Sequence, residues 1–235
     1  MLMAAGLGTR LRPLTLDRPK ALVTVAGKPL IDHVLDRLAA AGVARVVVNV
    51  HAFADDLEAH LAQRRDMEIQ ISDERAGLLE TGGGLKKARP FLGDEPLLVA
   101  NVDSIWTEAP GRPAIDRLLD AWDSARMDDL LLLAPVATSL GWSGPGDFHR
   151  LADGRLIHRR DRPDPLFANA GVHLMNPRLI DAWPEGSHGI FDHWMALAAR
   201  GRLHGVPMEG VWMHVGDPSA HAAAEARLSQ GADGP

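Results

Sequence analysis

The chain has 235 residues, of which 46% are hydrophobic and 24% are charged, a composition typical of one globular domain. It has no cysteine, which excludes disulfide bonds, thiolate metal sites and a cysteine nucleophile. Its formal charge of −6 argues against nucleic acid as a partner, and no apolar run is long enough to cross a membrane. We therefore expect a cytoplasmic protein, in which a local basic cluster could still bind a small phosphate-bearing ligand.

Predicted strands alternate with predicted helices through the first half of the chain. Short runs rich in apolar residues indicate strands at 1–5, 44–50, 67–72 and 95–103. Apolar residues at helical spacing indicate helices at 28–42, 54–64 and 82–92. This order predicts an α/β fold with a mainly parallel sheet and helices on both faces. Ligands of such sheets bind beyond the carboxyl ends of the strands.

The pattern becomes less regular after about residue 107. Helices are expected at 113–125, 193–200 and 218–228. Shorter strands are expected at 129–136, 156–160, 168–175, 202–208 and 210–216. Because no linker, repeat or low-complexity tract interrupts the sequence, we expect a single domain over 1–235 whose second half elaborates one edge of the sheet.

The stretch AAGLGTRLRP follows the first predicted strand and has the chemistry of a phosphate-binding loop. Gly6 and Gly8 let the backbone approach an anion, and Arg10 adds a guanidinium group that matches phosphate oxygens. A dinucleotide fingerprint would need a third glycine where Leu11 stands, and the P-loop pattern is absent. From these residues alone, a surface turn with solvated basic side chains stays open as an alternative.

Several motifs together resemble the sugar-1-phosphate nucleotidyltransferase family. They are AAGLGTRLRPLT, PKALVTVAGKPLI, LLETGGGLKKA, VANVDSIW, GDF at 146–148, NAG at 169–171 and GVWMHVGDPSAHAAAEARL. The resemblance implies a Rossmann-like, mostly parallel or mixed sheet, with a nucleotide-binding half at 1–107 and a sugar-phosphate-binding half at 108–235. It also implies Mg²⁺-dependent transfer of a nucleotidyl group from an NTP to a sugar 1-phosphate.

Among substrates, the form of LLETGGGLKKA favours UTP with N-acetylmuramic acid 1-phosphate, which would place the reaction in peptidoglycan recycling. GTP with mannose 1-phosphate, and glucose 1-phosphate with dTTP or UTP, stay open as alternatives.

The resemblance also assigns roles to individual residues. The expected catalytic residues are Arg10, Lys20 and Asp103, with Asp103 also binding Mg²⁺. The expected nucleotide-binding residues are Ala5, Gly6, Gly8, Thr9, Thr81, Gly82 and Gly83. The expected sugar-phosphate-binding residues are Glu80, Asp147, Asn169, Gly171 and Arg162. Because a phosphate monoester is already ionised near neutral pH, the nucleophile needs no general base, and the protein supplies positioning and charge.

The chain departs from the family pattern at two positions. His214 stands where the family has a second metal-binding aspartate, and imidazole suits Mg²⁺ poorly. Asp103 would then hold the ion with phosphates and water alone, or His214 would act through a bound water. Nearby Asp217 precedes a proline and is expected to cap the last helix. In RDRP, Arg162 stands in for a lysine that many relatives use, although a plain solvated loop is an alternative.

Two other classes of function compete with the enzyme. A non-catalytic nucleotide-sugar-binding regulator is favoured by His214 alone, and a nicotinamide-dependent dehydrogenase is disfavoured by the missing third glycine. We expect a monomer or a homodimer.

Overall fold

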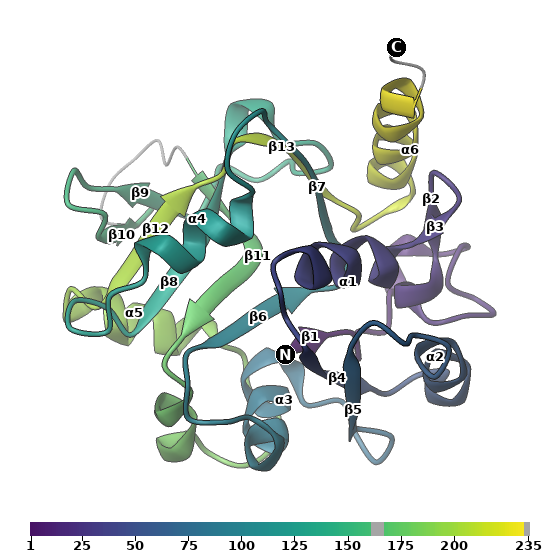
Figure 1. Cartoon of the computed structure of the whole chain (residues 1–235), viewed down its shortest axis with the longest axis horizontal. Helices are drawn as coiled ribbons and strands as arrows, with labels where there is room; N and C mark the ends of the chain where they lie inside the picture. Colours follow the sequence, from purple (N-terminus) through teal and green to yellow (C-terminus); the bar gives the residue numbers. More distant parts are fainter. Residues whose placement is uncertain (161–166, 233–235) are drawn as a thin grey trace.

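The first half of the chain forms the parallel part of a large sheet in the computed structural model, which describes residues 1–160 and 167–232 (Figure 1). The four parallel strands are β1 (Leu2–Met3), β4 (Arg45–Val50), β5 (Glu68–Asp73) and β6 (Leu97–Asn101). Strand β1 pairs in parallel with both β4 and β6, and β5 pairs with β4. The spatial order is therefore β5-β4-β1-β6.

The second half extends this sheet with mostly antiparallel pairing. Its strands there are β8 (Asp129–Pro135), β9 (Phe148–Arg150), β10 (Leu156–His158), β11 (Phe167–Met175) and β12 (Leu203–Pro207). Strand β11 joins the halves because it pairs antiparallel with β6 as well as with β8 and β9. Strand β12 adds a parallel pair to β8. The expected mixed sheet is confirmed, with nine strands within the described residues.

Helices cover both faces of the sheet, as expected. They are α1 (Leu30–Ala40), α2 (Ala54–Leu61), α3 (Glu80–Ala88), α4 (Ala114–Ala121), α5 (Phe191–Ala199) and α6 (Pro218–Ala232). Side chains alternate along the strands: Val46 and Val48 pack into one core with α1 and α2, whereas Val47 packs into the opposite core with α3. Because both faces of β4 are buried, its sequence is an almost continuous run of apolar residues.

Two short pairings were not expected from the sequence. Strand β7 (Ser104–Glu108) pairs antiparallel with β13 (Gly210–His214), away from the main sheet. A hairpin of β2 (Thr24–Val25) and β3 (Lys28–Pro29) lies next to α6, whose Glu225 accepts a hydrogen bond from the backbone of Ala26 (Figure 1). The β7–β13 pairing brings His214 into register with Ser104, next to Asp103.

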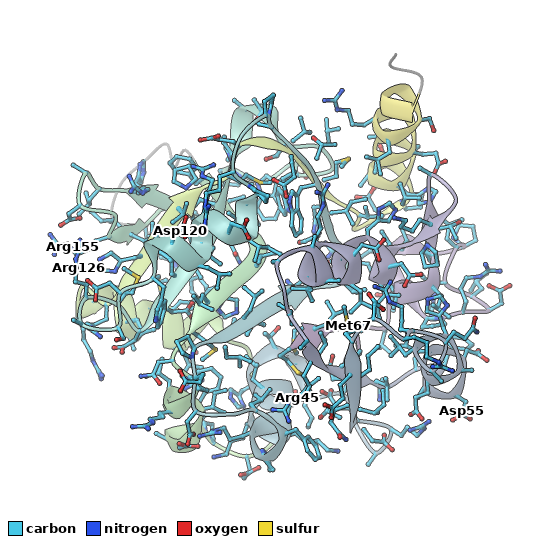
Figure 2. The ribbon with its side chains drawn as sticks, in the orientation of Figure 1. Arg45, Asp55, Met67, Asp120, Arg126 and Arg155 are labelled. Atoms are coloured by element: carbon cyan, nitrogen blue, oxygen red, sulfur yellow. The ribbon has the colours of Figure 1, made fainter. Side chains whose placement is uncertain are left out.

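Charged side chains gather at the periphery of the molecule (Figure 2). At the outer edge of the second half, Arg126 donates to the backbone oxygen of Asp153 at 3.1 Å, and Arg155 pairs with its carboxylate at 2.7 Å. On α2, Asp55 pairs with Arg75 at 2.6 Å. Exposed pairs of this kind contribute little to stability. No helix within the described residues is both long enough and apolar enough to span a bilayer.

A buried polar group stabilises the second half. Asp129 accepts hydrogen bonds from Trp194 Nε1 at 2.9 Å and, at its other oxygen, pairs with His173 Nδ1 at 2.8 Å. All three side chains are buried. The carboxylate therefore fixes the indole ring of α5 against the sheet.

We expect Asp129→Ala to lower the free energy of unfolding by about 3 kcal/mol, because it leaves two buried polar groups without partners. Chemical denaturation of the purified variant measures this loss. The matched control is Asp120→Ala, which removes only a surface pair with Arg112 and should change stability little. Equal stability of the two variants would contradict the role given to Asp129.

Candidate active site

The order of the parallel strands creates a crevice at the carboxyl end of the sheet. The chain runs from β1 outward through β4 to β5, and then returns to place β6 on the other side of β1. The strand order therefore changes direction between β1 and β6, and ligands of open α/β sheets bind at such a point. The glycine-arginine loop follows β1, and Asp103 follows β6. The structure thus brings together the two motifs that the sequence singles out.

A cavity of about 420 Å³ lies at this crevice. Its lining includes the predicted residues Ala5, Gly6, Gly8, Thr9, Arg10, Lys20, Glu80, Thr81 and Asp103. The wall formed by the loop is compact, because Thr15 Oγ1 donates to the backbone oxygen of Gly8 at 2.8 Å. Gly8 has φ of +62°, and a Cβ there would lie 3.0 Å from the side chains of both Thr15 and Lys20. Glycine is therefore required at position 8 by both conformation and space.

Lys20 and Asp103 form an ion pair at the floor of this cavity. Their side chains, 83 residues apart in sequence, meet with Lys20 Nζ 2.7 Å from Asp103 Oδ2. The lysine side chain is only 9% exposed and the aspartate side chain 19%. Burial raises the pKa of Asp103, but the charge of Lys20, its hydrogen bond to the carboxylate, and the charge of His214 when protonated outweigh this effect, so the pKa lies below its ordinary value. The carboxylate is therefore ionised at neutral pH.

His214 faces the same carboxylate from β13. Its Nδ1 lies 3.9 Å from Asp103 Oδ2. Burial lowers the pKa of His214 and the charges of Lys20 and Arg10 lower it further, against the opposite effect of Asp103. The imidazole is therefore neutral at pH 7. Asp217, in contrast, accepts a hydrogen bond from the backbone of Ala220 at 2.9 Å, which confirms its role as the cap of α6.

The single carboxylate of Asp103 suits a hard divalent cation that takes most of its ligands from a bound phosphate and water. Within residues 1–160 and 167–232, no group of three or more acidic or histidine side chains is placed to hold a metal ion by itself. Mg²⁺ typically uses one or two protein carboxylates and completes its shell with phosphate oxygens and water. Asp103 supplies one such carboxylate.

The opposite wall of the cavity comes from the segment that leads into α3. Thr81 and Glu80 line the cavity there, and Glu80 has φ of +60°, a conformation that costs a non-glycine residue about 1 kcal/mol. Gly82 and Gly83 lie outside the cavity lining. A Cβ on Gly82 would lie 2.5 Å from the ring of His188, and one on Gly83 would lie 2.2 Å from the backbone oxygen of Gly186. These two glycines therefore allow close packing of α3 against the segment at 186–189.

A second, smaller cavity of about 200 Å³ adjoins the first, with Asn101 in the walls of both. The predicted residues Asp147, Asn169, Gly171 and His214 line it together. Asp147 accepts a hydrogen bond from the backbone of Asn169 at 2.9 Å, and the Asn169 side chain accepts one from the backbone of Gly171 at 3.1 Å. The register of β11 with β8 shifts between Asn169 and His173. Such bulges commonly re-aim side chains next to active sites.

Aromatic side chains form much of this second cavity, and the sequence analysis did not assign them to the site. They are Trp142, Phe148, Phe191, Trp194 and Trp212. Trp194 lies at helical spacing in α5 and would be taken for ordinary core packing from sequence alone. Only the tertiary structure shows that its ring borders a cavity. Arg162, the remaining predicted sugar-phosphate residue, falls outside the described residues.

Two buried polar residues behind the first cavity were also missed. Asn49, near the end of β4, lines the cavity, and Glu74 follows β5 directly. Both are buried and hydrogen-bonded to each other at 2.8 Å. The asparagine does leave a signal in the sequence, because it is the one polar residue within the apolar run VVVNV.

Comparisons with known proteins identify the family and the fold. The sequence profile of the family described as "Nucleotidyl transferase" matches residues 1–136. The N-acetylmuramate alpha-1-phosphate uridylyltransferase of Caulobacter vibrioides is 53% identical over 98% of this chain and 96% of its own length. The protein of the same name from Neisseria meningitidis serogroup B is 33% identical over 92% of each chain. A crystal structure of apo UDP-glucose pyrophosphorylase, at 16% identity, superposes with a TM-score of 0.79 over 98% of each chain and supports the fold.

Gly171 lines the second cavity next to Asn101, which borders both cavities, and its substitution tests how little space there is at this junction. A Cβ there would lie 2.4 Å from Ser104 Oγ and 3.1 Å from Asn101 Nδ2, and the residue has φ of +71°. We expect Gly171→Ala to destabilise the fold by about 2 kcal/mol more than Gly27→Ala does, because it adds steric overlap to the backbone strain. Gly27 is a matched control, because it has φ of +74° and a Cβ there would have no heavy atom within 4 Å. Denaturant titration of both variants gives the comparison, and equal losses would show that space at residue 171 is not limiting.

Proposed function

We propose that this chain, which belongs to the nucleotidyl transferase family and is a sugar-1-phosphate nucleotidyltransferase, joins UTP to N-acetylmuramic acid 1-phosphate and releases pyrophosphate. The observation that carries the proposal is a polar, charged cavity that meets an aromatic one at Asn101, beside the Lys20–Asp103 pair. The choice of UTP and of this sugar is supported by the relative from Caulobacter vibrioides, which bears that activity in its name.

We place the nucleotide in the first cavity. Backbone N–H groups of the loop at 6–9 are suited to phosphate oxygens, and Arg10 brings a guanidinium group to the same wall. The triphosphate is the more highly charged substrate, and the cationic groups Arg10 and Lys20 both line this cavity. The base then lies toward Leu78, Glu80 and Thr81, at the start of α3.

We place the sugar in the second cavity. Ring faces of Trp194 and Phe148 suit the apolar face of a pyranose, and Asp147 and Asn169 offer polar groups for its hydroxyls. Its 1-phosphate would lie toward the junction at Asn101, near Asp103. This placement keeps Glu80 on the nucleotide side, whereas its predicted role was on the sugar side.

The reaction is the attack of a sugar-phosphate oxygen on the α-phosphorus of UTP, with pyrophosphate as the leaving group. One P–O bond forms as another breaks, and no protein group has to accept a proton, because the attacking phosphate is already ionised. Arg10 stabilises the charge that develops on pyrophosphate, and Lys20 holds the carboxylate of Asp103 while it faces the phosphates. Asp103 would hold Mg²⁺, which adds positive charge against the phosphate oxygens when it is bound.

This assignment places the enzyme in the cytoplasm and in peptidoglycan recycling, since it uses an amino sugar acid of the cell wall in phosphorylated form. We expect it to work as a monomer or a homodimer.

Arg10→Ala is expected to lower kcat by at least roughly a hundredfold, the scale seen when one electrostatic stabiliser is lost. The control is Arg12→Ala, which removes an exposed arginine of the same loop that does not line the cavity. Steady-state assays of pyrophosphate release measure both. Similar rates for the two variants would remove Arg10 from the catalytic residues.

Asp103→Asn is expected to lower kcat by a similar factor, roughly a hundredfold, while the fold stays intact. Asparagine keeps an oxygen acceptor for the buried ammonium of Lys20, whereas Asp103→Ala would leave that charge without a partner. Thermal melting checks the fold, and a Mg²⁺ titration of activity checks the mechanism. A folded Asp103→Asn enzyme with normal turnover and normal Mg²⁺ dependence would refute the assignment.

The substrates are tested by crossing UTP, GTP, dTTP, ATP and CTP with a panel of sugar 1-phosphates under Mg²⁺. The expected result is one fast pair, UTP with N-acetylmuramic acid 1-phosphate. A faster reaction of GTP with mannose 1-phosphate, or of glucose 1-phosphate with dTTP or UTP, would replace the proposed substrates with one of those pairs.

A further inference from the structure

Asn49 and Glu74 connect the two walls of the nucleotide cavity through a short series of hydrogen bonds. Asn49 Oδ1 accepts from the backbone N–H groups of Ala4 at 2.6 Å and Ala5 at 3.3 Å. Asn49 Nδ2 donates to Glu74 Oε1 at 2.8 Å, and Glu74 Oε2 accepts from the backbone N–H of Leu79 at 3.1 Å. One end of the series is therefore the start of the phosphate loop, and the other end is the segment that leads into α3.

Three of the four bonds satisfy backbone N–H groups with a side-chain acceptor, and the fourth joins the two side chains. Strand β1 ends at Met3, so the N–H groups of Ala4 and Ala5 no longer face a partner strand, and Asn49 on the neighbouring strand supplies the acceptor. Buried N–H groups without an acceptor are costly, so this side chain sets where the loop leaves the sheet. The N–H of Leu79 is satisfied in the same way at the other wall.

Glu74 is a fully buried carboxylate that has no ion pair in the parts of the chain that the structure describes. It is therefore not placed there to bind a neighbouring cation. Gly84 leaves it room, because a Cβ at that residue would lie 2.8 Å from Glu74 Oε1 and 3.1 Å from Asn49 Nδ2. A glycine inside a helix costs about 1 kcal/mol relative to alanine, and here that cost keeps the space open.

The direction of the series explains why a carboxylate stands at residue 74. Both of its oxygens receive a donor, one from Asn49 Nδ2 and one from Leu79 N. Glutamine has one oxygen, so its NH₂ group would face a donor at one of the two sites. Asn49 cannot turn over to compensate, because its own NH₂ group would then face the donors of Ala4 and Ala5.

We propose that Asn49 and Glu74 are positioning residues that hold the phosphate loop and the base-side segment at the separation needed for nucleotide binding. This inference rests on the proposed placement of the nucleotide in the first cavity. It predicts a selective effect: loss of the series weakens nucleotide binding, whereas the sugar cavity, formed by other elements, keeps its affinity.

The test uses a reversal of the donor–acceptor order in the full-length enzyme. Glu74→Gln alone should weaken the Kd for the nucleotide at least about tenfold, as expected when a buried hydrogen bond is lost, with KM for the sugar 1-phosphate unchanged. Asn49→Asp alone places two carboxylates face to face and should also weaken binding. In the double variant, the new carboxylate at residue 49 accepts from the two alanine N–H groups and from the new amide NH₂ at residue 74. The oxygen of that amide accepts from Leu79, so every donor again has an acceptor.

The decisive result is whether Glu74→Gln weakens or strengthens UTP binding, compared between the wild-type protein and the Asn49→Asp protein. We expect this substitution to weaken UTP binding in the wild-type enzyme and to strengthen it in the Asn49→Asp background, as measured by calorimetric titration without the sugar. The Asn49→Asp variant and the double variant carry the same charge at residue 49. The repulsion between this charge and the triphosphate therefore cancels when their Kd values are compared. Glu68→Gln, an exposed change at the start of β5, is the control and should leave Kd unchanged.

Thermal melting separates the remaining outcomes. A double variant that regains the melting temperature but not the affinity would show that the pair supports only the fold, and the proposal falls. A double variant that regains neither also overturns it, because the donor–acceptor order then does not matter. If the wild-type enzyme binds no nucleoside triphosphate, the proposed function fails; if it binds one and Glu74→Gln binds it equally well, the positioning role alone fails.

Discussion

The ion pair between Lys20 and Asp103 is the interaction on which the arrangement of the site depends. It joins the loop after β1 to the end of β6, two segments that are neighbours in the sheet but 83 residues apart in sequence. A buried ammonium or carboxylate with neither an ion pair nor hydrogen bonds would be strongly disfavoured, and here each group stabilises the charge of the other in the cavity floor. A cation and an anion side by side also suit a site that must attract phosphates and hold a divalent metal ion.

This pair can form because of the order of the strands. With β1 in the middle, β4 and β6 flank it on either side, and the loops after β1 and β6 open a crevice at their carboxyl ends. The second half of the chain then closes that crevice from one side. Strand β11 pairs with β6, and β13 brings His214 against Asp103. The main sheet thus continues from the strands that border the first cavity to those that border the second, with Asn101 at the junction.

Much of the fold and of the site could be predicted from the sequence, since local patterns indicate the strands and helices that position the site residues. Apolar runs and helical spacing located the main strands and helices, and the loop motif located Arg10 and Lys20. What could not be predicted depends on contacts between distant segments. Strand β7 was missed because its pairing partner, β13, lies about a hundred residues further along the chain. Trp194 lies in an ordinary helical pattern, and Glu74 follows a strand as any surface acid might, so neither shows its surroundings in the sequence.

The two cavities differ in what forms their walls, and this difference bears on how specificity arises. The first cavity, where we propose that the triphosphate binds, is lined by the glycine-arginine loop and a few charged side chains, which suit any nucleoside triphosphate. The second is lined largely by residues of β9, β11, α5 and β13, none of which belongs to the phosphate loop. A fold divided in this way can keep its chemistry while its sugar changes, because the group that reacts is held by one set of residues and the group that is recognised by another. In the proposed placement the base is the intermediate case: it lies toward residues 78–81, and the backbone N–H of Leu79 in that segment donates to the buried carboxylate of Glu74 behind it.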